Sequence, residues 1–233
     1  MNTNSIKVVI AGTDTGVGKT ILSAVMAVGL EAYYWKPIQS GYEKDQFGYT
    51  DRERVKNMGQ IGDDFLLPEA YVFEHALSPH AAAELEDVEI NPARLSVPCV
   101  NRSLVIEMAG GLMVPLRNDL LSIDLLKHWE LPVLICSRTK LGTINHTLLS
   151  IEALKSRGIP VLGVVFSGEA EPVSERAVRK FTDVPVLGRI PFLNEINRMS
   201  LKSVFDNDLN LSGIGLSSQI KTTTSSDLEK NWS

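Results

Sequence analysis

A glycine-punctuated loop near the N-terminus carries the clearest chemical signal in the chain. Residues Ile6 to Thr20 read IKVVIAGTDTGVGKT, an apolar run that leads into a loop ending in Gly18-Lys19-Thr20. Such a loop points successive backbone N–H groups into one concavity at a helix N-terminus, where unpaired donors and the helix dipole favour a phosphate. The lysine then reaches the terminal phosphates, and the Thr20 hydroxyl binds Mg²⁺. The loop therefore predicts a binding site for a phosphate chain.

The loop departs at one position from the strict phosphate-binding pattern. The pattern G-x-x-x-x-G-K-[ST] requires glycine at position 13, but the chain has Thr13 there and Gly12 one residue earlier. An ordinary glycine-rich turn with a surface lysine is the alternative. The neighbouring elements favour the phosphate site. Val8 to Ala11 is a mostly β-branched run suited to a buried strand, and Lys19 to Leu30 predicts a mostly apolar helix.

Two further charged residues directly follow predicted strands. Lys36 comes after the run Ala32 to Trp35, with the Ser40 hydroxyl four residues later, and Glu107 comes after Leu104 to Ile106. Ligands of parallel sheets bind where strands end at the carboxyl edge, so both residues are candidates for the phosphate site. A carboxylate there suits Mg²⁺, directly or through water. The alternatives are a solvated surface lysine, and a carboxylate that caps a helix or forms an ion pair.

Asp51 and the turn at Gly142 are weaker signals. Asp51 opens the segment Asp51 to Val55, where aspartate is also a favourable first-turn residue of a helix, so metal binding and a helical role both stay open. The turn from Leu141 to His146 enters a predicted helix and is a second potential anion site. A histidine inside a helix, as His146 is expected to be, is more often a packed side chain than a ligand or base.

Strand-length apolar runs alternate with helical segments along the chain, which predicts βαβ units. We therefore expect a single-domain α/β fold over residues 1–217, doubly wound in three α/β/α layers, with a mostly parallel sheet and a P-loop. Gly158 fits the position just after a helix C-terminus. Residues 59–100 predict loops with one or two short helices, and residues 218–233 predict a flexible tail. The remaining predicted strands are Val133 to Cys136, Val161 to Phe166 and Val186 to Ile190, and further helices begin at Ser122, Thr143 and Pro172.

Composition and charge argue against several classes of protein. The chain has 233 residues, 44% of them hydrophobic, and its formal net charge of −5 opposes nucleic acid as a partner. No apolar run approaches the roughly 20 residues that span a bilayer, and the N-terminus lacks the apolar segment of a signal peptide, so we expect a cytoplasmic protein without a membrane partner. Cys99 and Cys136 lie in apolar surroundings and predict two buried thiols, with neither a disulfide nor a metal-ligand spacing.

Six segments of the chain together carry a resemblance to a known family. They are Gly12 to Thr20, Lys36 to Gly41, Ser78-Pro79-His80, Glu107 to Gly111, Lys140 to His146 and Gly188 to Pro191. GTDTxVGKT followed by KPxxSG is far more specific than a generic P-loop, and the combination resembles the dethiobiotin synthase (dethiobiotin synthetase) family of biotin biosynthesis. The resemblance extends from Ile6 to about Leu193.

The resemblance implies an activity and an assembly. In this family, 7,8-diaminononanoate and CO₂ (or bicarbonate) give dethiobiotin by ATP-dependent closure of a ureido ring. The reaction passes through a carbamate and a carbamic-phosphoric anhydride, releases ADP and phosphate, and requires Mg²⁺. Members of the family are homodimers with the substrate bound at the subunit interface.

The resemblance also implies catalytic and metal-binding roles. Lys19 would hold the ATP phosphates, Lys36 would neutralise the carbamate and the phosphoryl group arriving on it, and Thr15 would orient the substrate together with Ser40. The implied Mg²⁺ ligands are Thr20, Asp51 and Glu107.

Two further binding sites follow from the resemblance. Gly142, Thr143 and Asn145 of the partner subunit would receive the distant carboxylate of the substrate. The implied nucleotide-binding residues are Asp14, Thr15, Gly16, Val17, Gly18, Lys19, Thr20, Ser167 and Pro191.

Two positions depart from the family pattern. Gly16 stands where many members carry an acidic residue, so a carboxylate contact to the substrate amines is absent or comes from elsewhere. Ser167 stands where some members use an asparagine to read adenine. Because serine lacks the paired donor and acceptor of an amide, the preference for a nucleotide base stays open.

Two rival functions fit the sequence less well. A partitioning or positioning P-loop ATPase carries a second, signature lysine, but an alignment on Gly18-Lys19-Thr20 puts Asp14 at that position. The acidic charge and the lack of a basic amphipathic C-terminal helix also oppose this rival. A P-loop kinase of a small metabolite would explain Lys36 but not the match at Ser78-Pro79-His80.

Overall fold

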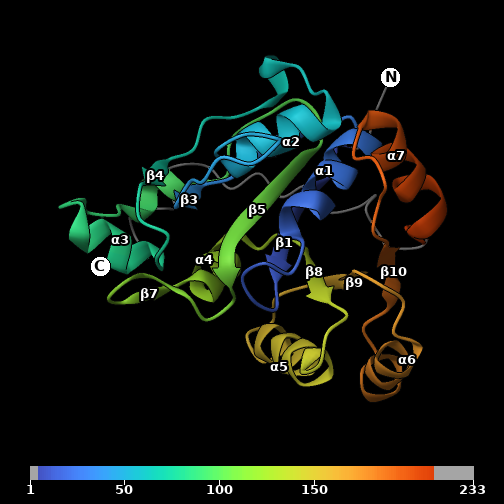
Figure 1. Cartoon of the computed structure of the whole chain (residues 1–233). Helices are drawn as coiled ribbons and strands as arrows, with labels where there is room; N and C mark the ends of the chain where they lie inside the picture. Colours follow the sequence, from blue (N-terminus) through green and yellow to red (C-terminus); the bar gives the residue numbers. More distant parts are fainter. Residues whose placement is uncertain (1–4, 213–233) are drawn as a thin grey trace.

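Six parallel strands form the central sheet of the protein, which is described here from a computed structural model covering residues 5–212. The strand order is β10-β9-β8-β1-β5-β2, so β1 lies inside the sheet between β5 and β8 (Figure 1). The loop after β1 therefore emerges from the middle of the carboxyl edge of the sheet. The six strands are β1 (Lys7–Gly12), β2 (Tyr33–Trp35), β5 (Leu104–Gly111), β8 (Val133–Arg138), β9 (Val161–Ser167) and β10 (Val186–Ile190).

Helices cover both faces of this sheet, because side chains of each strand alternate between two cores. Val8 and Ile10 of β1 pack into one core with α1, α2 and α7, whereas Val9 and Ala11 pack into the other core with α3, α4, α5 and α6. The expected three-layer, doubly wound α/β fold is confirmed. The α-helices are α1 (Lys19–Gly29), α2 (Asp51–Gly59), α3 (Pro79–Leu85), α4 (Ser122–Trp129), α5 (Thr143–Lys155), α6 (Pro172–Phe181) and α7 (Arg198–Ser203).

Local sequence signals placed several helix ends correctly. The helices expected at Ser122, Thr143 and Pro172 begin at those residues. After α5, Gly158 has φ +69°, its N–H bonds to the Lys155 carbonyl, and the Ile159 N–H bonds to the Leu154 carbonyl. This pair of bonds is the Schellman arrangement, and its left-handed residue explains the glycine.

Two expectations about the secondary structure were wrong. Residues 59–100 contain a strand, β4 (Tyr71–Phe73), besides α3 and the two short 3₁₀ helices η1 (Asp63–Phe65) and η2 (Pro92–Leu95). The strand β4 pairs with β3 (Ile38–Ser40), a strand that was not among those predicted. Three-residue strands show no measurable alternation, and only their pairing stabilises them. Strand β5 also runs on past Ile106 to Gly111, because Gly111 still pairs with Gly12 of β1.

The chain contains a few smaller elements. Strands β6 (Pro115–Arg117) and β7 (Leu120–Leu121) form an antiparallel hairpin, and the π-helix η3 (Val204–Asp208) follows α7. Within residues 5–212, no helix is both long and apolar enough to cross a bilayer. The expected domain limit at residue 217 and the expected tail over 218–233 lie outside the described residues.

Candidate active site

A cleft of about 920 Å³ opens at the carboxyl edge of the sheet, beside the loop that follows β1. The loop, the segment after β2, the start of α2 and the end of β5 all contribute to it. Residues 76–79 and Ile196 also line it, so the cleft brings together residues from widely separated parts of the sequence. The predicted site residues that line it are Thr15, Gly16, Gly18, Lys19, Thr20, Lys36, Ser40, Asp51 and Glu107.

The loop after β1 has the geometry of a phosphate site. Gly18 precedes α1 with φ +99°, no side chain caps the helix, and its first turn holds no acidic residue. The N–H groups at the helix N-terminus and the helix dipole are therefore available to bind an anion. Lys19 Nζ folds back and donates to the Asp14 carbonyl at 2.8 Å. A Cβ at Gly12 would lie 2.7 Å from Lys19 Nζ and 2.8 Å from the Asp14 oxygen. The structure therefore explains why glycine stands at position 12.

Asp51 and Glu107, which are far apart in sequence, converge on Lys36, and Glu107 also contacts Thr20. Lys36 Nζ donates to Asp51 Oδ2, and to Glu107 Oε1 at 3.1 Å. The Thr20 hydroxyl donates to the same Glu107 oxygen at 3.0 Å. The Glu107 side chain is fully buried inside β5, where Glu107 is paired with Ile10 of β1. Glu107 is thus an ion-pair partner of Lys36. Lys36 is buried, so the alternative that it is a solvated surface lysine is wrong.

Charge and burial have opposite effects on the pKa values of Lys36 and Asp51. Burial lowers the pKa of Lys36, but the attraction of Glu107 and Asp51 outweighs it and raises the pKa above its ordinary value. Burial raises the pKa of Asp51, and the Lys36 charge reverses this and lowers it. Burial and the repulsion of Lys36 lower the pKa of Lys19. A bound phosphate would therefore relieve the repulsion between the two lysines.

The donor set in the cluster fits a magnesium ion. Asp51 Oδ2 and Glu107 Oε1 both lie against Lys36 Nζ, the Thr20 hydroxyl lies against the same Glu107 oxygen, and all three are hard oxygen donors. Among residues 5–212, no group of three or more His, Cys, Asp or Glu side chains is placed to hold a metal ion. A cation bound by two carboxylates and a hydroxyl needs further oxygens, and Mg²⁺ commonly takes these from water and nucleotide phosphates.

Three polar residues that support this cluster were not found from the sequence. Tyr34 donates its hydroxyl to Glu107 Oε2 at 2.9 Å, and Arg54 Nη1 donates to Asp51 Oδ1 at 3.0 Å. Gln39 Oε1 accepts the Asp51 N–H at 3.1 Å. Tyr34 lies in β2 two residues before Lys36, and Arg54 lies one helical turn after Asp51. These spacings are the signals that would have identified both.

Other predicted residues of the cleft are available to a ligand. Within the described residues 5–212, the Ser40 hydroxyl is buried and has no hydrogen-bond partner, so it is free to bond to a ligand. Thr15 and Gly16 are exposed at the cleft, and Gly16 has φ +68°. The Thr15 N–H bonds to Asp14 Oδ1 at 2.7 Å, which orders the loop. Val17 is buried beneath the loop.

Ser167 and Pro191 lie outside the lining of the cleft. Ser167 ends β9 and packs against the loop, since a Cβ at Gly18 would lie 2.4 Å from the Ser167 hydroxyl oxygen. Pro191 directly follows β10, which pairs with β9. Both residues therefore lie on the β9 side of the loop, and their role at a nucleotide base stays a prediction.

Gly142, Thr143 and Asn145 do not line the cleft either. Gly142 precedes α5 with φ +93° and without a side-chain cap, so this helix start is the predicted anion site. Gly142 and Asn145 are exposed. The Thr143 side chain is buried, with its hydroxyl at 2.8 Å from Ser137 Oγ, so Thr143 would reach a ligand only through its backbone.

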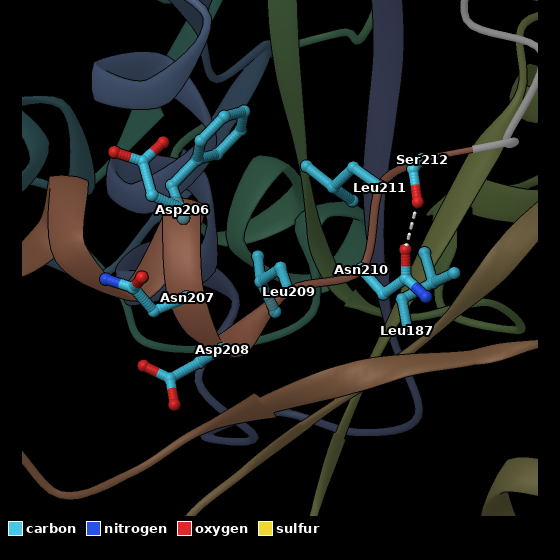
Figure 2. A pocket seen from close by; sticks show the side chains of 9 residues that line it. Leu187, Asp206, Asn207, Asp208, Leu209, Asn210, Leu211 and Ser212 are labelled. Carbon is cyan, nitrogen blue, oxygen red and sulfur yellow. Dashed lines mark hydrogen bonds between the residues drawn. The ribbon is translucent and has the colours of Figure 1, made fainter.

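A second pocket, of about 540 Å³, lies where the C-terminal part of the described chain crosses β10 (Figure 2). It is formed by Leu187 and by residues 205–212, and Asn210 and Ser212 bond to each other at 2.6 Å. Asp206 and Asp208 are the ionisable groups among its nine lining residues. Because two carboxylates repel phosphate, this pocket does not fit a nucleotide.

The two cysteines differ, contrary to the expectation that both are buried. Cys136 is buried under the loop, where its thiol donates to the Val17 carbonyl at 3.3 Å, and Cys99 is exposed. Position 99 lies outside the regular elements, so apolar neighbours in sequence do not ensure burial.

Burial raises the pKa of the Cys136 thiol to about 12, so it stays neutral at working pH. We expect Ellman's reagent to label one thiol rapidly in the native protein and two after denaturation. The Cys99→Ser variant should abolish the fast phase, and Cys136→Ser should leave it unchanged. A fast phase that survives Cys99→Ser would contradict the burial of Cys136.

Comparisons with known proteins agree with this geometry. Residues 7–200 match the AAA domain family. The chain is 47% identical over 203 residues to the ATP-dependent dethiobiotin synthetase BioD of Rhodopseudomonas palustris (strain HaA2), covering 87% of this chain and 93% of the relative. It is also 47% identical over 207 residues to the BioD of Agrobacterium fabrum, covering 89% and 96%.

Similarity to solved structures supports the fold. The septum site-determining protein MinD of Pyrococcus horikoshii, complexed with Mg-ADP, aligns with a TM-score of 0.55 at 14% identity, covering 93% of this chain and 100% of that protein. Identity this low concerns the P-loop fold alone. The high identity over nearly the whole length of the curated relatives is more specific, and it shows that this chain belongs to the ATP-dependent dethiobiotin synthetase family.

Proposed function

We propose that this protein closes the ureido ring of dethiobiotin from 7,8-diaminononanoate and CO₂, with ATP as co-substrate and Mg²⁺ as cofactor. The observation that carries the proposal is the convergence of Thr20, Lys36, Asp51 and Glu107 beside a phosphate-binding loop in one cleft. Membership of the synthetase family supports the same reaction. The septum-site protein shares only the fold, and Asp14 stands where the rival ATPase class has its signature lysine.

The reaction proceeds in three steps. One substrate amine adds to CO₂ and loses a proton, which gives a carbamate. A carbamate oxygen attacks the γ-phosphorus of ATP, the bond to the bridging β,γ-oxygen breaks, and ADP leaves. The second amine then attacks the carbamoyl carbon, loses a proton and expels phosphate, and the ring is closed. These steps need positioned groups and positive charge rather than a protein nucleophile.

The residues in the cleft have matching roles in the proposal. Lys19 and the N–H groups of the loop hold the β- and γ-phosphates. Lys36 neutralises the carbamate and then the phosphoryl group that moves onto it. Thr15 and Ser40, which both line the cleft, orient the carbamate and the amines; the unpaired Ser40 hydroxyl supports this role.

In this proposal, the metal ion and the nucleotide base bind at separate places. Thr20, Asp51 and Glu107 would hold Mg²⁺, which supplies charge stabilisation for phosphate oxygens when bound. The nucleotide base would lie near Ser167 and Pro191, on the β9 side of the loop.

The proposal includes a homodimer. Gly142 and Asn145 are exposed and lie outside the cleft of their own subunit, which supports their action on a substrate held by the other subunit. The uncapped N-terminus of α5 would then receive the distant carboxylate of 7,8-diaminononanoate.

The activity is tested by product analysis. The protein is incubated with 7,8-diaminononanoate, bicarbonate, Mg²⁺ and ATP, CTP or GTP in parallel, and dethiobiotin is measured by mass spectrometry. We expect dethiobiotin with ATP, and none in the presence of excess EDTA. The Lys19→Ala protein serves as the background control. Absence of product with every nucleotide would refute the proposed function.

A further inference from the structure

In each of the two acidic residues of the proposed metal site, the two carboxylate oxygens have different hydrogen-bond partners. Glu107 Oε1 and Asp51 Oδ2 both face Lys36 Nζ, which lies between them. The other oxygen of each carboxylate points away from that position and is held by a different donor: Glu107 Oε2 by Tyr34, and Asp51 Oδ1 by Arg54. Four oxygens are thus divided into an inner pair and an outer pair.

We infer that Tyr34 and Arg54 are positioning residues that select which oxygen of each carboxylate faces the metal ion. This inference rests on the proposed function, because it takes Asp51 and Glu107 as magnesium ligands. It adds two residues that reach the ion only through these carboxylates. They hold the inner oxygens in place whether Lys36 or the cation lies between them.

Tyr34 is suited to hold a fully buried carboxylate. Its side chain is 0% exposed and its body packs in the core with α1 and α2, so the hydroxyl has little freedom to move. Its bond of 2.9 Å to Glu107 Oε2 spans 73 positions of sequence. Without this donor, the outer oxygen would be a buried charged acceptor without a partner, and the side chain would gain alternative rotamers.

Arg54 holds Asp51 from the opposite side of the cluster. Besides Asp51 Oδ1, it donates to Asp45 Oδ2 and to the Glu43 carbonyl, both at 2.8 Å. Its guanidinium therefore ties the first turn of α2 to the preceding loop. The planar fork of arginine lets Arg54 bond to Asp51 Oδ1 through Nη1 while its other two nitrogens bond to the loop.

The chain offers a close control for each variant. Tyr33→Phe makes the same chemical change one residue away, on a hydroxyl that reaches Asn101 Oδ1 at 3.5 Å and not Glu107. Asp45→Asn weakens the tie from Arg54 to the loop while it leaves the bond from Arg54 to Asp51 in place. Both controls alter exposed contacts and leave the hydrogen bonds to the Asp51 and Glu107 carboxylates in place.

The test measures metal binding without turnover. Free Mn²⁺, used as a probe for the magnesium site, is titrated against protein and the non-hydrolysable analogue AMP-PNP and followed by electron paramagnetic resonance. We expect Tyr34→Phe and Arg54→Gln each to weaken Mn²⁺ binding by about 10-fold or more, within the range found for residues that orient metal ligands. Tyr33→Phe and Asp45→Asn should change it by no more than about twofold, because exposed contacts contribute little.

A second readout separates positioning from general damage. The affinity for AMP-PNP in EDTA should stay near that of the wild type in Tyr34→Phe and Arg54→Gln, because only the metal-dependent part of binding is lost. If the variants lose the same amount of AMP-PNP affinity with and without metal, the two residues have a merely structural role and the inference is overturned. If Arg54→Gln does not fold, Arg54→Lys is used, and we expect the same direction from it because an ammonium lacks the fork.

The outcomes distinguish this inference from the proposed function. Glu107→Gln and Asp51→Asn should lose Mn²⁺ affinity, and if they do so while Tyr34→Phe and Arg54→Gln do not, only the inference on positioning fails. If Glu107→Gln and Asp51→Asn keep wild-type affinity, the proposed metal site fails and the inference fails with it. Formation of dethiobiotin by the wild type is tested independently of both.

Discussion

The Lys36→Met variant is expected to lose activity by at least about 100-fold, comparable to the loss of one preorganised donor for transition-state charge. In the structure, Lys36 Nζ lies where the two inner carboxylate oxygens meet, at the edge of the cleft that holds Thr15 and Ser40. Single-turnover measurements at saturating ATP should show that the chemical step is slowed. Nucleotide affinity should stay close to that of the wild type, because Lys19 and the loop are unchanged.

The same variant should also be less stable without metal. Removal of Lys36 leaves the buried Glu107 without its cation and leaves Asp51 with Arg54 alone, and breaking a buried ion pair in this way costs about 3–5 kcal/mol. Mg²⁺ should restore more stability to Lys36→Met than to the wild type, because in the wild type the ammonium occupies the same two oxygens. Urea unfolding in EDTA and in Mg²⁺ measures both effects.

A surface lysine provides the control for this prediction. Lys155 pairs with Asp183 on the exposed side of α5, so Lys155→Met should change stability far less than Lys36→Met and leave activity unchanged. Lys19→Ala should differ again, with a clear loss of nucleotide affinity. A Lys36→Met protein with a near-normal rate would remove Lys36 from the proposed site.

Mixed dimers are expected to recover activity that neither parent variant has. In the proposed dimer, each site combines the loop of one subunit with Asn145 of the partner subunit. Asn145→Asp places a negative charge beside the substrate carboxylate, and Lys19→Ala removes the phosphate contact, so each homodimer has two damaged sites. A heterodimer concentrates both lesions in one site and leaves the other site intact.

The size of the recovery follows from pairing statistics. Half of randomly paired dimers are mixed and each keeps one of two sites, so a co-refolded equal mixture should reach up to about a quarter of wild-type activity. The separate homodimers, assayed at the same total concentration, give the baseline. Activity that merely equals the average of the two parents would mean that each site lies within one subunit, and the role of Asn145 would be wrong.

The phosphate loop and the helix starts were predictable because they depend on neighbouring residues. The strand, loop and helix around Gly18-Lys19-Thr20 follow in one short stretch, and the left-handed position at Gly158 needs only its own helix. The alternating pattern of strands and helices likewise predicted the parallel sheet. The family resemblance supplied the roles of Asp51 and Asn145, which the residue types alone left open.

Only the tertiary structure decided how the predicted residues are arranged and supported. Glu107 was expected after a strand but lies inside β5, because the pairing with β1 continues to Gly111. The strand β4 exists because β3 pairs with it, and Cys99 is exposed because its segment lies outside the regular elements. Each of these facts depends on strand pairing or burial between distant segments, and local sequence does not encode them.

The support of the carboxylates illustrates the same limit most clearly. The sequence by itself predicted Lys36, Asp51 and Glu107 as candidates for a phosphate or metal site, since each is a charged residue beside a strand or helix end. It did not determine which oxygen of Glu107 meets Lys36 and which meets Tyr34, because that choice depends on the register of β2 against β5. Residue types specify the chemistry that is possible, whereas packing of distant strands sets the direction of each hydrogen bond.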